Sequence, residues 1–307
     1  MTEQDHAACP AVCRERWSVE LAPLGIPTVI IADDPQLIAT ADAALADWRV
    51  ETPALEPIIE IRLTRDDAPF DDVSPAIRVE GSRLTLTGGG IAGWADAGTR
   101  CAECIVPDRL LGRPSALAEE VIDTLLLFLL TRNGRPPVHA SGVMIGNRLL
   151  MLAGRSGSGK STLALAAAGL GLPVLSDDTL YVELDPDLRV WGFPRAIHVF
   201  PEDAPTGEHF ARTRNGKLKR AVPIGTTSAL HADRARLIVL DRGTHVRLDR
   251  ISAAEAIERL GPAEPGFDLL RDQNLAAIEA LAAAGAWRLT LTDDPGVAIA
   301  LLLDAFA

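Results

Sequence analysis

Positive charge is scarce in this chain of 307 residues. Lysine and arginine number 30, against 42 aspartates and glutamates, so the formal net charge is −12. An acidic surface repels nucleic acid and anionic lipid, and we therefore expect neither as a general partner. Any phosphate site must be built locally, from a loop and a few basic side chains.

The sequence also lacks a long run of apolar residues. Its densest run, 121–130, is short and contains Asp123, whereas a membrane-spanning helix needs ~20 such residues. The first 16 residues mix acids and bases, unlike a signal peptide. These absences predict a cytoplasmic protein without a membrane partner. Hydrophobic residues still make up 48% of the chain, enough for one large domain or two ordinary ones.

Cysteine is rare and occurs as one C-x-x-x-C pair and one C-x-x-C pair, formed by Cys9, Cys13, Cys101 and Cys104. Four cysteines in a chain of this length, without an export signal, indicate free thiols rather than a disulfide framework. A zinc site built from both pairs is the alternative, although the spacing of the first pair is unusual for one. We favour free thiols.

The first part of the chain, residues 1–115, is rich in proline and in short β-like runs. We expect an α+β domain of unknown role, because no catalytic pattern is found there. The expected elements are strands at 28–32 and 58–63, a hairpin of 77–79 with 83–87, a helix at 36–48, and a turn at the three glycines 88–90.

The remainder, residues 116–307, alternates between strands and helices and predicts an α/β domain. The expected helices are 116–131, 162–169, 253–260, 268–284 and 296–306. The expected strands are 141–145, 148–153, 173–178, 235–240 and 287–291. A proline- and base-rich stretch, 200–223, interrupts them and is typical of a long loop.

The strongest motif is Gly154-Arg155-Ser156-Gly157-Ser158-Gly159-Lys160-Ser161, followed by Thr162. It matches G-x-x-x-x-G-K-[ST], the phosphate-binding P-loop, and it lies between an expected strand and an expected helix. Glycines let backbone amides approach phosphate oxygens, and the start of the helix adds partial positive charge. Lys160 then reaches the β- and γ-phosphates, and the Ser161 hydroxyl can coordinate Mg²⁺.

Two later strands end in aspartate. Asp177 and Asp178 follow the strand after the loop's helix, so they belong at the sheet edge that carries the phosphates. Paired acids at such a position can divide two tasks, one polarising a hydroxyl and the other serving the metal. Asp241 ends a second strand, 237–240, which resembles a Walker B strand. Either place could hold Mg²⁺ through water.

The stretch from His139 to Glu183, HASGVMIGNRLLMLAGRSGSGKSTLALAAAGLGLPVLSDDTLYVE, resembles the C-terminal kinase domain of HPr kinase/phosphorylase. It is most similar to the wider set of HPr-kinase-like bacterial proteins, which includes kinases that tailor lasso peptides. The shared features are His139 before a hairpin, the G-x-S-G-x-G-K-S loop, a short helix and a strand ending in Asp-Asp. The Glu-Ile-Arg-Gly signature of HPr kinases is absent, so the acceptor stays open.

The resemblance implies an α/β fold with a P-loop core of the HPr kinase and phosphoenolpyruvate carboxykinase type. It also implies ATP and Mg²⁺ as cofactors, with Lys160 and Ser161 at the phosphates and metal. Asp177 would be the general base toward the acceptor hydroxyl, Asp178 would assist the metal, and His139 would lie near the base or the γ-phosphate. The first 115 residues fall outside the resemblance.

A basic stretch within the long loop stands out in this acidic chain. It comprises Arg212, Arg214, Lys217, Lys219 and Arg220, and it follows Arg195. Cationic clamps neutralise the transferring group in phosphoryl transfer, and we expect Arg195, Lys217, Lys219 and Arg220 to contact phosphate or substrate. A solvated loop is the alternative.

Together these patterns predict an ATP-dependent kinase that phosphorylates a serine-type hydroxyl of a peptide, protein or small molecule. A P-loop ATPase or GTPase switch is the competing hypothesis, although neither Asn-Lys-x-Asp nor Leu-Ser-Gly-Gly-Gln occurs in the chain. A module that only senses nucleotide is a third. The choice between ATP and GTP, the acceptor and the formation of a homo-oligomer stay open.

Overall fold

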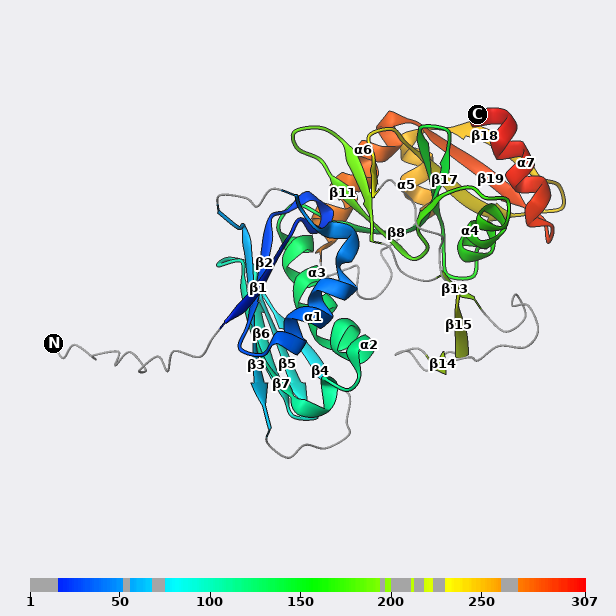
Figure 1. Ribbon diagram of the computed structural model, residues 1–307. Coiled ribbons are helices and arrows are strands. Elements are labelled where there is room, and N and C mark those ends of the chain that lie inside the picture. Colours follow the sequence, from blue (N-terminus) through cyan, green and yellow to red (C-terminus); the bar gives the residue numbers. More distant parts are fainter. Residues whose placement is uncertain are drawn as a thin grey trace. The chain divides into compact units, whose positions relative to one another are not determined.

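The computed structural model describes residues 16–51, 56–67, 75–193, 197–199, 211–212, 218–222, 230–260 and 270–307. The chain divides into two compact units, Met1–Leu129 and Leu130–Ala307 (Figure 1). The division lies inside helix α3 (Asp123–Arg132). The boundary expected from the sequence, between residues 115 and 116, falls inside α2 (Pro114–Leu117), the first part of the helical segment that contains α3.

The described part of the first unit contains a seven-stranded mixed sheet. In sheet order its strands are β1 (Trp17–Leu21), β2 (Thr28–Ala32), β3 (Ile59–Asp66), β7 (Cys101–Pro107), β6 (Ile91–Asp96), β5 (Arg83–Gly88) and β4 (Ala76–Glu80). Strands β2, β3 and β7 are parallel, and the other neighbours are antiparallel. The expected hairpin is β4 and β5, and the expected glycine turn connects β5 to β6.

Helix α1 (Pro35–Ala44) packs on β1 and β2 and contacts the helical segment near the end of the unit (Figure 1). That segment comprises α2 (Pro114–Leu117), a π-helical turn (Ala118–Ile122) and α3, and 3₁₀ turns occur at Pro23–Gly25, Ala46–Trp48 and Asp108–Leu110. Asp34 starts α1, because its carboxylate accepts a hydrogen bond from the Gln36 backbone N–H at 2.7 Å. The expected helix 36–48 therefore consists of α1 and the turn at Ala46–Trp48.

The described part of the second unit contains a nine-stranded mixed sheet. Its order is β16 (His231–Ala232), β12 (Arg189–Gly192), β11 (Thr179–Glu183), β8 (Pro137–Ile145), β9 (Arg148–Ala153), β17 (Ala235–Arg242), β19 (Ala286–Leu291) and β18 (Arg247–Ile251), with β10 (Val174–Ser176) paired to β8. Strands β9, β17 and β19 are parallel. Strand β8 is antiparallel to β9, and β18 is antiparallel to β19.

Helices cover both faces of this sheet. They are α4 (Lys160–Gly169), α5 (Ala253–Leu260), α6 (Arg271–Ala284) and α7 (Pro295–Phe306). Leu150 and Leu152 of β9 pack in one cluster with residues of α4 and α7. Met151, between them, packs in a second cluster with residues of α5 and α6. This alternation produces a helix–sheet–helix sandwich, since consecutive strand side chains point to opposite faces.

The structure is thus a mixed α/β fold, as the sequence predicts. Three further strands, β13 (Ile197–Val199), β15 (Leu218–Val222) and β14 (Ala211–Arg212), form a small antiparallel sheet. Within the described ranges, no helix combines the length and the apolar character that spanning a membrane requires.

The C-x-x-C pair lies in β7, where Cys104 is 2% exposed and Cys101 is half-buried. Residues three apart in a strand point to opposite faces of the sheet, so these two thiols diverge. Cys9 and Cys13 lie outside the described residues. Within the described part of the chain, no group of three or more histidine, cysteine or acidic side chains could hold a metal ion.

Candidate functional site

The glycine-rich loop, residues 154–161, leaves the carboxyl end of β9 and leads into α4. Gly157 and Gly159 have φ values of +81° and +106°, in the left-handed region that side chains rarely adopt. A Cβ at Gly159 would also stand 3.2 Å from the Leu291 side chain and 3.3 Å from the Arg242 guanidinium. Glycine at this position therefore allows the loop to turn tightly against β17 and β19.

Lys160 begins α4 and is 6% exposed. Its ammonium donates hydrogen bonds to the carbonyls of Gly154 at 2.7 Å and Arg155 at 3.2 Å. The lysine thus folds back across its own loop and holds a positive charge against the loop's interior. Ser161 and Thr162 follow in the first turn of α4, both half-buried.

Ser158 carries a buried hydroxyl that finds no hydrogen-bond partner among the described residues. A Cβ on Gly154 would approach this oxygen to 2.8 Å, so Gly154 allows the two sides of the loop to close. An unpaired buried hydroxyl costs on the order of 1–3 kcal/mol. A ligand or an ordered water could supply the hydrogen bond that this hydroxyl lacks among the described residues.

The acid pair lies at the same sheet edge as the loop. Strand β10 is antiparallel to β8, and β8 is antiparallel to β9, so β10 and β9 run in the same direction. Asp177 follows the last residue of β10 and is 5% exposed. The fully buried Ser141 of β8 donates its hydroxyl to the Asp177 carbonyl and lies 3.2 Å from the Oδ1 atom of that residue.

His139 stands beside the second acid. Its Nδ1 atom is 2.9 Å from the Asp178 carbonyl oxygen and 3.5 Å from Oδ1 of the same residue. The partnership follows from strand pairing, because Thr179 of β11 is opposite His139 of β8. The Asp178 side chain is 71% exposed. The two neighbouring acids therefore occupy different environments, one enclosed and the other in solvent.

Gly192 of β12 keeps this corner compact. A Cβ at Gly192 would collide with the backbone carbonyl and the side chain of Leu175 in β10. Only a residue without a side chain allows β12 to approach β10 this closely. The position of Asp177, two residues after Leu175, consequently depends on a strand that pairs elsewhere in the sheet.

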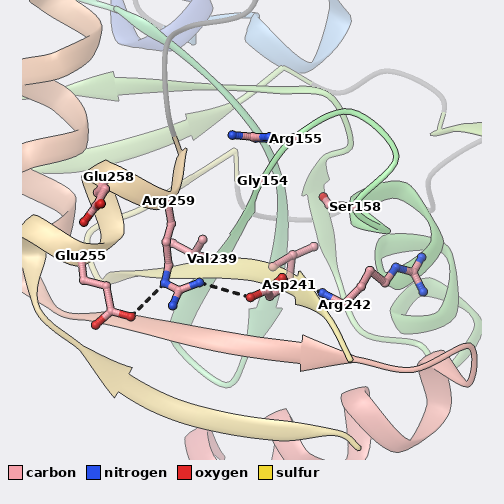
Figure 2. Close-up of a pocket in the computed structure, with 10 residues that line it drawn as sticks. Gly154, Arg155, Ser158, Val239, Asp241, Arg242, Glu255, Glu258 and Arg259 are labelled. Carbon is pink, nitrogen blue, oxygen red and sulfur yellow. Dashed lines mark hydrogen bonds and ion pairs between the residues drawn. The ribbon is translucent and has the colours of Figure 1, made fainter. Parts of the chain in front are cut away.

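A pocket of about 560 Å³ opens on the other side of the glycine-rich loop (Figure 2). Three loop residues, the end of β17 and helix α5 line it: Gly154, Arg155, Ser158, Val239, Leu240, Asp241, Arg242, Glu255, Glu258 and Arg259. The guanidinium of Arg259 forms ion pairs with Glu255, at 2.8 Å, and with Asp241, at 3.2 Å. Asp241 is thus held in an ion pair at the pocket wall.

Arg242 places a second guanidinium beside the loop. It donates to the Thr292 carbonyl at 3.2 Å and lies 3.7 Å from Asp293. Its side chain is about half exposed. Both contacts come from the segment after β19, which therefore holds Arg242 near Gly159 and the start of α4.

The basic residues proposed from the long loop lie in or beside segments that the structure does not describe. Arg195, Arg214 and Lys217 lie outside the described residues. Lys219 and Arg220 fall in β15, and Arg212 in β14. Their predicted contacts with phosphate stay predictions.

Comparisons with known proteins identify no family. No family model matches the chain, and no curated protein matches it. Among solved structures it is similar to the Hpr(Ser) kinase/phosphatase from Coxiella burnetii, with 13% sequence identity. The match covers 55% of this chain and 94% of that chain, with a TM-score of 0.28.

Several residues of the site are absent from the sequence prediction. Ser141 adjoins Asp177, and Arg242 and Arg259 adjoin the loop and Asp241. Their contacts follow from strand register and helix placement, which bring together residues far apart in the chain. No short motif marks them, although Arg242 directly follows the Walker B-like aspartate.

Proposed function

We propose that the second unit is a phosphotransferase with a P-loop core, which transfers the γ-phosphate of ATP to a serine-type hydroxyl. The observation that carries this proposal is the meeting of the glycine-rich loop and a buried acid at one sheet edge. Kinases of this chemical type need a phosphate cradle and a base positioned near its open side. A peptide, a protein or a small molecule can supply the acceptor hydroxyl.

The chain's own residues would divide the work as follows. Backbone amides of residues 154–161 and the start of α4 bind the phosphates. Lys160 exchanges its two loop carbonyls for phosphate oxygens, where its charge counters the charge of the transferring group. Asp177 accepts the proton of the acceptor hydroxyl as the oxygen attacks phosphorus. His139 orients the neighbouring Asp178.

The oxygen donors at this edge fit Mg²⁺. The Ser161 hydroxyl and the solvent-facing Asp178 carboxylate are the proposed ligands, and Mg²⁺ typically keeps several waters beside one or two protein oxygens and the substrate phosphates. When bound, the ion would neutralise charge on the phosphates. Asp241 is the less suitable ligand, because Arg259 already pairs with it.

The test is transfer of labelled γ-phosphate from ATP to hydroxyl-bearing acceptors, including serine peptides, with hydrolysis measured in parallel. A kinase shows slow hydrolysis alone and a phosphorylated product with a suitable acceptor. Equal hydrolysis with and without acceptors, and no product in a broad panel, would favour the NTPase alternative. GTP in place of ATP distinguishes the preferred nucleotide.

A further inference from the structure

We propose that the pocket between the glycine-rich loop and α5 holds the nucleoside of the bound nucleotide, with Asp241 and Glu258 facing the ribose hydroxyls. This assignment rests on the proposed function and adds the direction in which the nucleotide lies. Neither Asp177 nor Lys160 lines the pocket. It is therefore separate from the acid pair, although both adjoin the same loop.

Strand order gives the direction. Along the sheet edge, β10 is followed by β8, β9 and β17. The loop rises from β9, with Asp177 on the β8 and β10 side and the pocket on the β17 side. Three strand spacings of ~4.8 Å separate β10 from β17, a span that an extended nucleoside triphosphate covers. With the γ-phosphate at Asp177, the nucleoside end points to the pocket.

The charges of the pocket change along its length. Arg155 belongs to the loop and Arg242 lies beside it, whereas Glu255 and Glu258 lie on α5, beyond the Asp241–Arg259 pair (Figure 2). The acidic end would repel phosphates, and the basic end suits them. Carboxylates accept hydrogen bonds from ribose hydroxyls in other nucleotide sites, so the acidic end suits a sugar.

The acidic residues of the pocket differ in whether they already form ion pairs. Arg259 pairs with both Glu255 and Asp241. Glu258 is exposed, and within the described part of the chain it has no ion-pair partner. Its carboxylate can accept a ligand hydrogen bond without breaking an existing pair. The pocket's size, about 560 Å³, lies in the usual range for small-molecule sites.

The experiment compares binding of Mg·ATP with binding of Mg·triphosphate, which lacks the nucleoside, by calorimetry on the full chain. We expect Glu258→Ala and Asp241→Asn each to weaken ATP about tenfold, the worth of one hydrogen bond to a charged group. Triphosphate affinity should change less than about twofold. Glu279→Ala, an exposed glutamate on α6, is the matched control and should bind both ligands normally.

Deoxynucleotides supply a second measurement. In the wild type, 2′-deoxy-ATP or 3′-deoxy-ATP should bind more weakly than ATP, and Glu258→Ala should reduce that discrimination. Equal weakening of ATP and triphosphate would overturn the nucleoside assignment. Unchanged ATP binding with a raised acceptor KM would also overturn it, because the pocket would then be the acceptor site. If the wild type binds neither ligand, the proposed function itself fails.

Discussion

The hydroxyl of Ser141 faces two hydrogen-bond acceptors of Asp177, its backbone carbonyl and its carboxylate. The Ser141 hydroxyl donates to the Asp177 backbone carbonyl and also lies 3.2 Å from the carboxylate oxygen Oδ1. A hydroxyl carries a single proton, so it favours one acceptor at a time. Ser141 thereby fixes the backbone of the proposed base and adjoins its charged group.

Ser141→Ala should lower kcat about tenfold while leaving the KM for ATP nearly unchanged, because it removes a positioning contact rather than a phosphate contact. In a double-mutant cycle, Ser141→Ala should lower kcat little further when Asp177→Asn is already present. A purely structural role would lower thermal stability and leave kcat unchanged.

The two acids should give separable defects. Asp177→Asn should lower kcat by ~10²-fold or more with nucleotide affinity retained, as expected for loss of a general base. Asp178→Asn should instead raise the Mg²⁺ concentration needed for half-maximal activity. Steady-state kinetics across a magnesium titration measure both. Mild and equal effects of the two changes would point to Asp241 as the metal partner.

Lys160→Ala should abolish transfer and weaken ATP binding, because the triphosphate would occupy the loop without its main cation. The matched control is Arg78→Ala in β4, which removes an exposed positive charge from the first unit. Its activity should match the wild type. Near-normal turnover in Lys160→Ala would show that the loop is not the phosphate site.

Asp34 makes the first unit's stability dependent on pH. Burial alone would raise the pKa of Asp34, but hydrogen bonds from Arg65 and the Gln36 backbone N–H hold this pKa below its ordinary value. A lowered native pKa stabilises the fold above the unfolded pKa of about 3.9, and this contribution is lost as pH falls through the native pKa.

Replacing this residue, Asp34→Ala, should lower the free energy of unfolding by about 1 kcal/mol at neutral pH, since it removes a helix cap. The difference in unfolding free energy between wild type and variant should narrow as pH falls from about 5 to about 3. Urea unfolding followed by tryptophan fluorescence measures this free energy at each pH. A difference that stays constant over this range would refute the electrostatic contribution.

The two described cysteines should react differently with a thiol reagent. Burial raises the pKa of the Cys104 thiol to about 12, so almost no thiolate forms there near pH 8. Cys101 is partly exposed and should be alkylated first. Peptide mapping by mass spectrometry follows each site, with unfolded protein as the reference. Equal rates in the folded protein would contradict the buried placement of Cys104.

Local signals predicted several elements well. Strand β9, which leads into the glycine-rich loop, matches the expected 148–153, helix α5 matches 253–260, and β2 of the first unit matches 28–32. Strands β6 and β7 were not predicted, because the sequences IAGWAD and CAECIVP mix apolar residues with glycine and acids. They are strands through pairing with each other and with β5 and β3, and β propensity depends strongly on such neighbours.

For the site, the order of strand, loop, helix and strand placed Asp177 at the same edge as the loop. The sequence did not reveal that β8 separates β10 from β9, and it therefore could not identify Ser141 as a neighbour of the base. Nor could it bring α5 beside the loop. That proximity depends on how the helix crosses the sheet, and no local pattern encodes this crossing.

Helix α7, near the last residues of the sequence, supports the helix that follows the glycine-rich loop. Helix α7 packs against α4, and Arg148 of β9 donates a hydrogen bond to the Phe306 carbonyl at 2.8 Å. Leu302 is fully buried in the cluster beneath α4. A cavity at Leu302 would weaken the packing of α4, the helix whose first residue is Lys160. If the loop binds phosphate as proposed, substitutions near the last residues should change the affinity for phosphate, although more than a hundred residues separate them from the loop.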